Sequence, residues 1–81
     1  MKIVDVREGS ELAKLLKTDS KVILDFYADW CNPCKVLTRT IEEIRKTNLF
    51  PEVTIAKINV DKFPEVAQNY KVRSMPTMLF T

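Results

Sequence analysis

The chain has 81 residues, of which 46% are hydrophobic and 30% are charged, and its formal net charge is +2. This length suits one small domain, and a nearly balanced charge with no basic run gives no support for nucleic-acid binding. No apolar run approaches the ~20 residues of a membrane span, and Asp5 rules out an apolar leader at the N-terminus. The sequence therefore predicts no membrane association and a cytoplasmic location.

Short apolar segments in the first part of the chain predict two strands with a helix between them. Residues Lys2–Val6 have the Ile and Val content that is typical of strands. Ser10 is the expected N-cap of a helix over Glu11–Lys17, whose leucines recur at helical spacing. The nearly continuous apolar run within Lys21–Ala28 predicts a central strand that is covered on both faces.

The remaining segments predict two more helices and two more strands. A helix is expected to begin near Pro33, because proline at the first turn loses no hydrogen bond. Four apolar side chains are expected on its buried face: Val36, Leu37, Ile41 and Ile44. Val53–Val60 reads as a strand, Asp61 is the expected cap of a short helix over Pro64–Tyr70, and Thr77–Thr81 begins a fourth strand. This β-α-β-α-β-α-β order favours a layered α/β domain.

The chain contains two cysteines, Cys31 and Cys34, and no histidine. A disulfide between them would enclose too short a loop to add much stability, so its value would be chemical. The positive end of a helix dipole stabilises a thiolate. We therefore expect Cys31, at the helix N-terminus, to be the exposed attacking thiol, and Cys34, one turn inside, to resolve the mixed disulfide.

Other interpretations of the cysteine pair stay open on the spacing alone. A Cys-x-x-Cys pair is often half of a zinc site, although here a partner chain would have to supply the remaining ligands. An iron–sulfur cluster held between two chains is a variant of that interpretation. The two cysteines can also be ordinary core residues. The position between a buried strand and a helix that starts with proline favours the redox interpretation.

Three segments, in order and at matching separations, resemble the thioredoxin family. Asp25–Lys35 resembles its active-site segment, Ala56–Asp61 its third strand, and Val72–Thr77 the loop that holds its cis-proline. The resemblance implies a single thioredoxin-like domain over residues 1–81, an α/β fold with a central mixed sheet flanked by helices. The family continues with a further strand and a closing helix, so we expect the last β-α unit to be missing and the domain to be truncated at its C-terminus.

The resemblance also implies which residues meet the substrate. The implied positions flank the disulfide: Trp30, Asn32, Pro33, Met75 and Pro76. Pro76 would be the cis-proline beside the disulfide, and the backbone of Met75 would pair with an extended substrate segment. Asn32 replaces the family's usual glycine, while Pro33 is the choice typical of reductants. Arg39 stands where the family's helix commonly carries a kinking proline, which predicts a straighter helix.

Asp25 and Lys57 are ionisable residues within apolar strand segments. Burial would raise the pKa of the Asp25 carboxyl and suit it to exchange a proton with Cys34. In the family the two positions are neighbours, and Lys57 is carried over as a member of the catalytic set. The alternative is that both side chains face solvent. Because the closing helix is expected to be missing, we also expect Asp25 to be wetter than in the family.

The sequence therefore predicts a thiol–disulfide oxidoreductase that reduces protein disulfides through its dithiol, with no metal and no cofactor besides the disulfide itself. Its expected partners are disulfide-bearing client proteins and an electron donor of the thioredoxin-reductase type. The alternative is a thioredoxin-like binding or assembly module without significant turnover. The exposed edge of the fourth strand further predicts a dimer.

Overall fold

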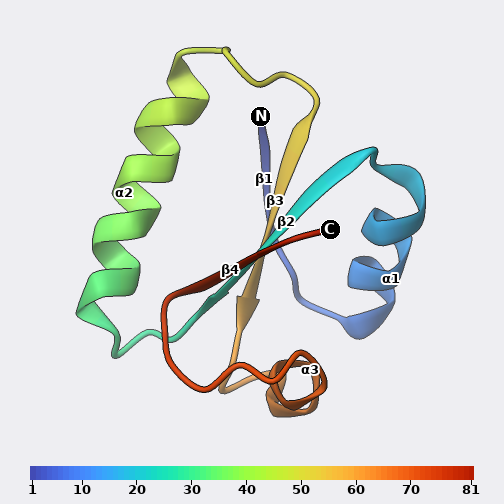
Figure 1. The fold of residues 1–81 in the computed structure, drawn as a ribbon, viewed down its shortest axis with the longest axis vertical. Helices are drawn as coiled ribbons and strands as arrows, with labels where there is room; N and C mark the ends of the chain where they lie inside the picture. The colour runs from blue at the N-terminus through green and yellow to red at the C-terminus, as the bar shows by residue number, and fades with distance from the viewer.

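A computed structural model describes all residues, 1–81, as one four-stranded sheet with three helices. The elements in chain order are β1 (Lys2–Asp5), α1 (Gly9–Thr18), β2 (Lys21–Tyr27), α2 (Asn32–Lys46), β3 (Val53–Asn59), α3 (Pro64–Asn69) and β4 (Thr77–Phe80). Helix α2 covers one face of the sheet, and α1 and α3 lie on the other (Figure 1). This arrangement confirms the predicted α/β layers. None of the helices is both long and apolar enough to cross a membrane.

The sheet has the strand order β1-β3-β2-β4, which puts β2 and β3 at its centre. These two strands run parallel and pair along their whole length, from Lys21 opposite Val53 to Tyr27 opposite Asn59. Strand β1 also runs parallel to β3, whereas β4 runs antiparallel to β2. The predicted mixed sheet is therefore confirmed, and the end of β2 delivers the cysteine segment to one end of the sheet.

The two faces of β2 divide the hydrophobic interior, because successive side chains of a strand point to opposite sides. Leu24 and Phe26 are fully buried on the side of α1 and α3. They belong to a core of nine buried residues: Val6, Leu12, Leu15, Val22, Leu24, Phe26, Ala56, Ile58 and Ala67. Asp25 and Tyr27 take the alternate positions and so lie on the side of α2. The polar side chains of β2, Asp25 and Tyr27, thus lie on the face of the sheet opposite the main hydrophobic core.

Three local predictions about the helices were wrong. Ser10 lies inside α1, whose N-cap is Glu8, and Glu11 instead accepts a hydrogen bond from the backbone N–H of Arg7 at 2.9 Å. Helix α3 begins after Phe63, with no side-chain cap from Asp61. Val36 and Ile44, both expected on the buried face of α2, are 54% and 37% exposed. Residue type alone therefore specified neither the first residue of α1 and α3 nor the side of α2 that faces the sheet.

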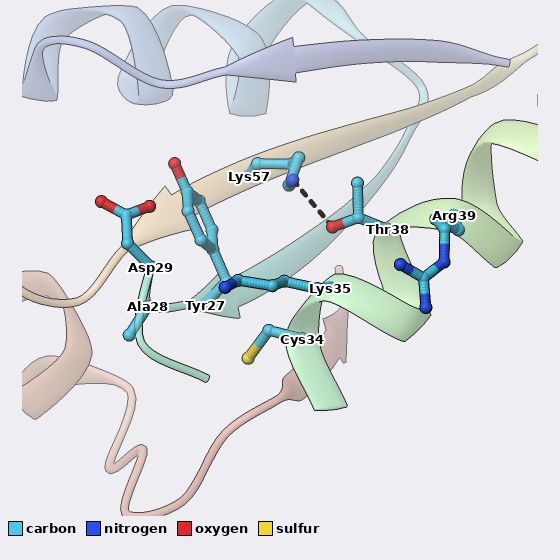
Figure 2. Close-up of a pocket in the computed structure, with 8 residues that line it drawn as sticks. All are labelled: Tyr27, Ala28, Asp29, Cys34, Lys35, Thr38, Arg39 and Lys57. Atoms are coloured by element: carbon cyan, nitrogen blue, oxygen red, sulfur yellow. Dashed lines mark hydrogen bonds between the residues drawn. The ribbon is translucent and has the colours of Figure 1, made fainter. Parts of the chain in front are cut away.

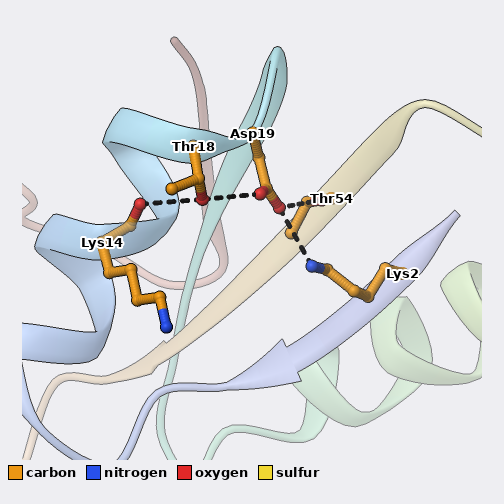
Figure 3. A network of polar contacts seen from close by, with 5 residues as sticks. All are labelled: Lys2, Lys14, Thr18, Asp19 and Thr54. Atoms are coloured by element: carbon orange, nitrogen blue, oxygen red, sulfur yellow. Dashed lines mark hydrogen bonds and ion pairs between the residues drawn. The ribbon is translucent and has the colours of Figure 1, made fainter.

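A polar network ties the end of α1 to the sheet (Figure 3). Asp19, just after the helix, accepts hydrogen bonds from the hydroxyls of Thr54 at 2.7 Å and Thr18 at 2.9 Å. Its carboxylate also forms an ion pair with Lys2 of β1 at 3.2 Å. These hydrogen bonds, led by the one from Thr54, lower the pKa of Asp19. The network joins α1, β1 and β3 at the end of the sheet opposite the cysteines.

Candidate active site

The two cysteines form a disulfide at the start of α2. Cys31 is the N-cap of this helix, and its Sγ accepts a hydrogen bond from the backbone N–H of Cys34 at 3.2 Å. Pro33 lies in the first turn, where its missing N–H leaves no helical carbonyl without a partner. A sulfur that accepts an amide hydrogen bond at the positive end of a 15-residue helix is in an environment that favours the thiolate.

Both cysteines are buried in this disulfide form: Cys31 is 5% exposed and Cys34 is 3% exposed. The prediction that Cys31 is exposed was therefore wrong. The reason is a small apolar cluster that the sequence did not reveal, in which Ala28 joins the two cysteines and Met75 packs against them. The segment of residues 28–34 and the loop at Met75, far apart in the sequence, thus close around the two sulfurs.

Trp30 precedes the disulfide and is 66% exposed, so it is not a core residue. Its indole Nε1–H donates a hydrogen bond to Oδ2 of Asp61 at 3.0 Å. Asp61 lies just after β3, where the side chain of Asn59 accepts its backbone N–H at 2.9 Å. The large exposed ring is therefore held in one orientation beside Cys31 by the end of a neighbouring strand.

The loop before β4 lies on the other side of the disulfide. The peptide bond between Met75 and Pro76 is cis. Met75 is partly buried against the cysteines, and its backbone takes part in none of the structure's backbone hydrogen bonds. Asn32 and Pro33, between the cysteines, are exposed. The residues that the family resemblance implies for substrate binding therefore surround one buried disulfide.

Asp25 lies at the centre of β2 and is 1% exposed, and its Oδ1 has no hydrogen-bond partner. Burial raises the pKa of its carboxyl, while the charge of Lys57 acts in the opposite direction. The expectation of a wetter Asp25 was wrong, because β3 and β4 flank it on both sides, with Lys57 and Met78 opposite it. Since the folded-state pKa exceeds the unfolded-state value, the stability given by the neutral carboxyl is lost as the pH rises through the folded-state pKa.

Lys57 occupies the register position beside Asp25 on β3, which confirms that the two are neighbours. Its ammonium, however, donates a hydrogen bond to Oγ1 of Thr38 on α2 at 3.0 Å and lies 4.5 Å from the centre of the Tyr27 ring. Figure 2 shows the hydrogen bond between Lys57 and Thr38. Both residues line a cavity of about 590 Å³. Eight residues line the cavity: Tyr27, Ala28, Asp29, Cys34, Lys35, Thr38, Arg39 and Lys57. The cavity therefore connects the surroundings of Lys57 with those of Cys34.

Sequence reasoning missed three residues at this site. Tyr27 was counted only as part of an apolar run, yet its hydroxyl donates to Asp5 at 2.9 Å, and burial, the largest cause, raises its pKa to about 12. Thr38 follows Cys34 by one helical turn, which was the available signal that it shares the face of the cysteine. Asp61 was assigned to a helix cap, although its place after a central strand at the cysteine end of the sheet pointed to the site.

The side chains offer no group of three or more His, Cys, Asp or Glu residues that could hold a metal ion. The site brings together the Cys31–Cys34 disulfide, the buried carboxyl of Asp25 and the ammonium of Lys57.

Comparison with known proteins matches residues 3–81 to the Thioredoxin family. The chain is 46% identical to a thioredoxin of Neurospora crassa over 76 residues, which are 93% of this chain and 60% of that protein. It is 42% identical to a thioredoxin of Mycoplasmoides gallisepticum over 75 residues, 93% of this chain and 73% of that protein.

Solved structures agree with the sequence matches. The oxidised form of mitochondrial thioredoxin 3 from Saccharomyces cerevisiae gives a TM-score of 0.84 at 32% identity, covering 96% of this chain and 72% of that one. The thioredoxin of Trypanosoma brucei brucei gives a TM-score of 0.86 at 30% identity, covering 99% and 69%. The chain thus spans between 60% and 73% of the lengths of these four proteins. With the Cys31–Cys34 disulfide at the start of α2, these matches show that the chain belongs to the thioredoxin family of thiol–disulfide oxidoreductases.

Proposed function

We propose that this chain is a protein-disulfide reductase in which Cys31 is the nucleophile and Cys34 the resolving cysteine. The observation that carries the proposal is the hydrogen bond from the Cys34 N–H to the sulfur of Cys31 at the N-terminus of α2. The same donor and the helix dipole would stabilise a Cys31 thiolate once the disulfide is reduced. The sulfur of Cys34 lacks this position at the helix end.

In the reductive half-cycle the Cys31 thiolate attacks one sulfur of a client disulfide and releases the other as a thiolate. Cys34 then loses its proton and attacks the sulfur of Cys31, so the Cys31–Cys34 bond forms and the bond to the client breaks. The client gains two electrons and takes up two protons, and the chain ends as a disulfide. A dithiol donor of the thioredoxin-reductase type restores the two thiols, and the disulfide is the only redox group the cycle requires.

Asp25 is the proposed acceptor of the Cys34 proton, with Lys57 as its charged neighbour. The carboxyl is buried, its pKa is raised by that burial, and one oxygen has no partner. Because burial raises its pKa, this carboxyl is a stronger base than an exposed aspartate with an ordinary pKa and accepts a proton more readily. We therefore assign to Asp25 a role in proton transfer and not in packing.

The client is proposed to bind in an extended form across Met75. The backbone groups of Met75 have no backbone partner, and its side chain packs against the cysteines, directly before Pro76. Trp30, fixed by Asp61, offers an apolar surface on the far side, and Asn32 and Pro33 lie exposed between them. Main-chain pairing with an extended segment accommodates many sequences, which suits a reductase with several client proteins. The dithiol state needs a reducing compartment, so a cytoplasmic location is part of the proposal.

The proposed activity is tested by reduction of insulin disulfides with dithiothreitol as the electron source. The wild-type chain is expected to accelerate the reaction, and Cys31→Ser is expected to bring the rate down to that of dithiothreitol alone, because no thiolate remains at the helix N-terminus. Thr40→Val, an exposed substitution on the same helix, serves as the control. A wild-type rate no higher than that of Cys31→Ser would contradict the proposal and leave the binding-module interpretation in its place.

We further propose that the free edge of β4 pairs with a second copy of the chain. Strand β4 has β2 on one side only, and Phe80 on this strand is 79% exposed. Charged residues on an edge strand oppose such pairing. Sedimentation equilibrium is therefore expected to show a concentration-dependent dimer for the wild type and a monomer for Phe80→Lys, whereas Leu49→Lys, at a 70% exposed position outside the sheet, should dimerise normally. A wild-type chain that is monomeric at every concentration would refute the pairing.

A further inference from the structure

Lys57 lies between two carboxylates and forms an ion pair with neither. In the register of the sheet it stands opposite Asp5 of β1 on one side and Asp25 of β2 on the other. Neighbouring strands are only about 4.8 Å apart, so a lysine can reach either carboxylate. Yet none of the four ion pairs in the structure includes Lys57. Something other than backbone spacing must hold its ammonium elsewhere.

Two contacts account for the position of the ammonium. Oγ1 of Thr38 accepts its hydrogen bond at 3.0 Å, and the face of the Tyr27 ring lies 4.5 Å away, within the range of a cation–π interaction. The ring itself is anchored, because its hydroxyl donates to Oδ1 of Asp5 at 2.9 Å. Tyr27 thereby also hydrogen-bonds to the Asp5 carboxylate, which Lys57 would otherwise meet on β1. Figure 2 shows Lys57 directed toward Thr38 on α2.

We propose that Thr38 and Tyr27 are positioning residues that hold the Lys57 ammonium away from Asp25, so that one oxygen of the buried carboxyl stays unpaired for the proton of Cys34. The inference rests on the proposed function, since it assigns a purpose to the unpaired oxygen. The electrostatic effect of Lys57 on Asp25 does not itself depend on turnover. An ammonium that reached Asp25 would stabilise the ionised carboxylate and make it a weaker base.

The charged and titratable groups around Asp25 limit what else can set its behaviour. Strand β4 presents Met78 opposite it and carries no ionisable residue. The other elements contribute groups that line the cavity or flank Lys57: Asp5 from β1, Tyr27 from β2, Asp29 after β2, Lys57 from β3, and Lys35 and Arg39 from α2, whose Cys34 is held in the disulfide. Of these, Lys57 is the charge that lowers the pKa of Asp25 against the effect of burial. A change in the position of the Lys57 ammonium is therefore expected to change the pKa of the Asp25 carboxyl.

The test is a titration of the Asp25 carboxyl by ¹³C NMR in the oxidised chain. Thr38→Val removes the hydroxyl and keeps the shape, and the freed ammonium should approach Asp25 and lower its pKa by about one pH unit. Thr38→Ala is a second test that does not depend on the folding of the valine variant, because alanine has high helix propensity. It should give the same shift of the Asp25 pKa. Thr38→Ser keeps the acceptor and should titrate like the wild type. The matched control is Thr40→Val, whose hydroxyl bonds the Val36 carbonyl on the same helix.

A double-mutant cycle separates positioning from a structural effect. In a Lys57→Met background, replacing Thr38 should produce no further shift, because the ammonium that it positions is gone. The inference is overturned if Thr38→Val and Thr38→Ala titrate like the wild type, if Thr38→Ser shifts as far as they do, or if the shift persists without Lys57. The titration involves no turnover, so its outcome is independent of the insulin assay and the two proposals can fail separately.

Discussion

Cys34→Ser is expected to stop the catalytic cycle at a covalent adduct on Cys31. The reduced wild-type chain should react with dithiobis(nitrobenzoate), close its own disulfide and keep no reagent, because Cys34 attacks the Cys31 sulfur and releases the bound thionitrobenzoate. In the variant Cys31 still attacks, but nothing resolves the mixed disulfide. The yield of released thionitrobenzoate should therefore fall by half, and intact mass should show the reagent attached to the protein.

The reciprocal variant is the control for the assignment of roles. Cys31→Ser leaves Cys34, which lies inside the first turn of α2 and lacks the N-cap position that stabilises a thiolate, so its reaction with the same reagent should be much slower. Stopped-flow absorbance compares the two rates directly. Equal rates for the two single variants would show that the cysteines are interchangeable and would refute the roles assigned to them.

Phe26→Ala is expected to remove a large part of the stability of the fold. The Phe26 side chain is fully buried in the core shared by α1, α3 and the sheet, and its ring lies 5.8 Å from that of Tyr70. Truncation of a buried phenylalanine costs about 3–5 kcal/mol, against about 5–15 kcal/mol for a typical domain. Urea denaturation followed by circular dichroism should show a much lower midpoint, and the variant is expected to be partly unfolded on warming.

The control for this truncation is Leu49→Ala, which shortens an apolar side chain that is 70% exposed. Its free energy of unfolding should lie within about 0.5 kcal/mol of the wild type, as for most surface substitutions. A loss at Phe26 no larger than the loss at Leu49 would mean that the cluster around β2 is not the core on which the fold depends.

The strands were predictable because burial imposes a plain pattern on them. The apolar run of β2 and the β-branched residues of β3 gave both central strands to within a residue, and Pro33 gave the start of α2. The cysteine pair and the place of Asp25 beside Lys57 followed from the motifs. These features depend on residues close in sequence, or on the order of elements in a known fold.

The failures share a different physical origin. Cys31 is buried by Met75, which is far along the chain, and no local pattern announces such a contact. Ser10 and Asp61 are good capping residues by type, yet α1 already begins at Gly9, and the carboxylate of Asp61 accepts a hydrogen bond from the indole of Trp30. The bond from Lys57 to Thr38 joins a strand to a helix and depends on side-chain direction, which sequence periodicity does not specify.

The strand order also determines when each strand can find its partner during synthesis of the chain. Lys2 pairs with Thr54, so β1 leaves the ribosome long before its only partner, and the parallel pairs of the sheet must wait for β3. The two cysteines, three residues apart, are able to bond with each other well before Val60 and Met75, which pack against them in the fold, have been synthesised. A newly made chain therefore exposes its thiols in an unshielded state, and a reducing environment during translation protects them until the sheet has closed.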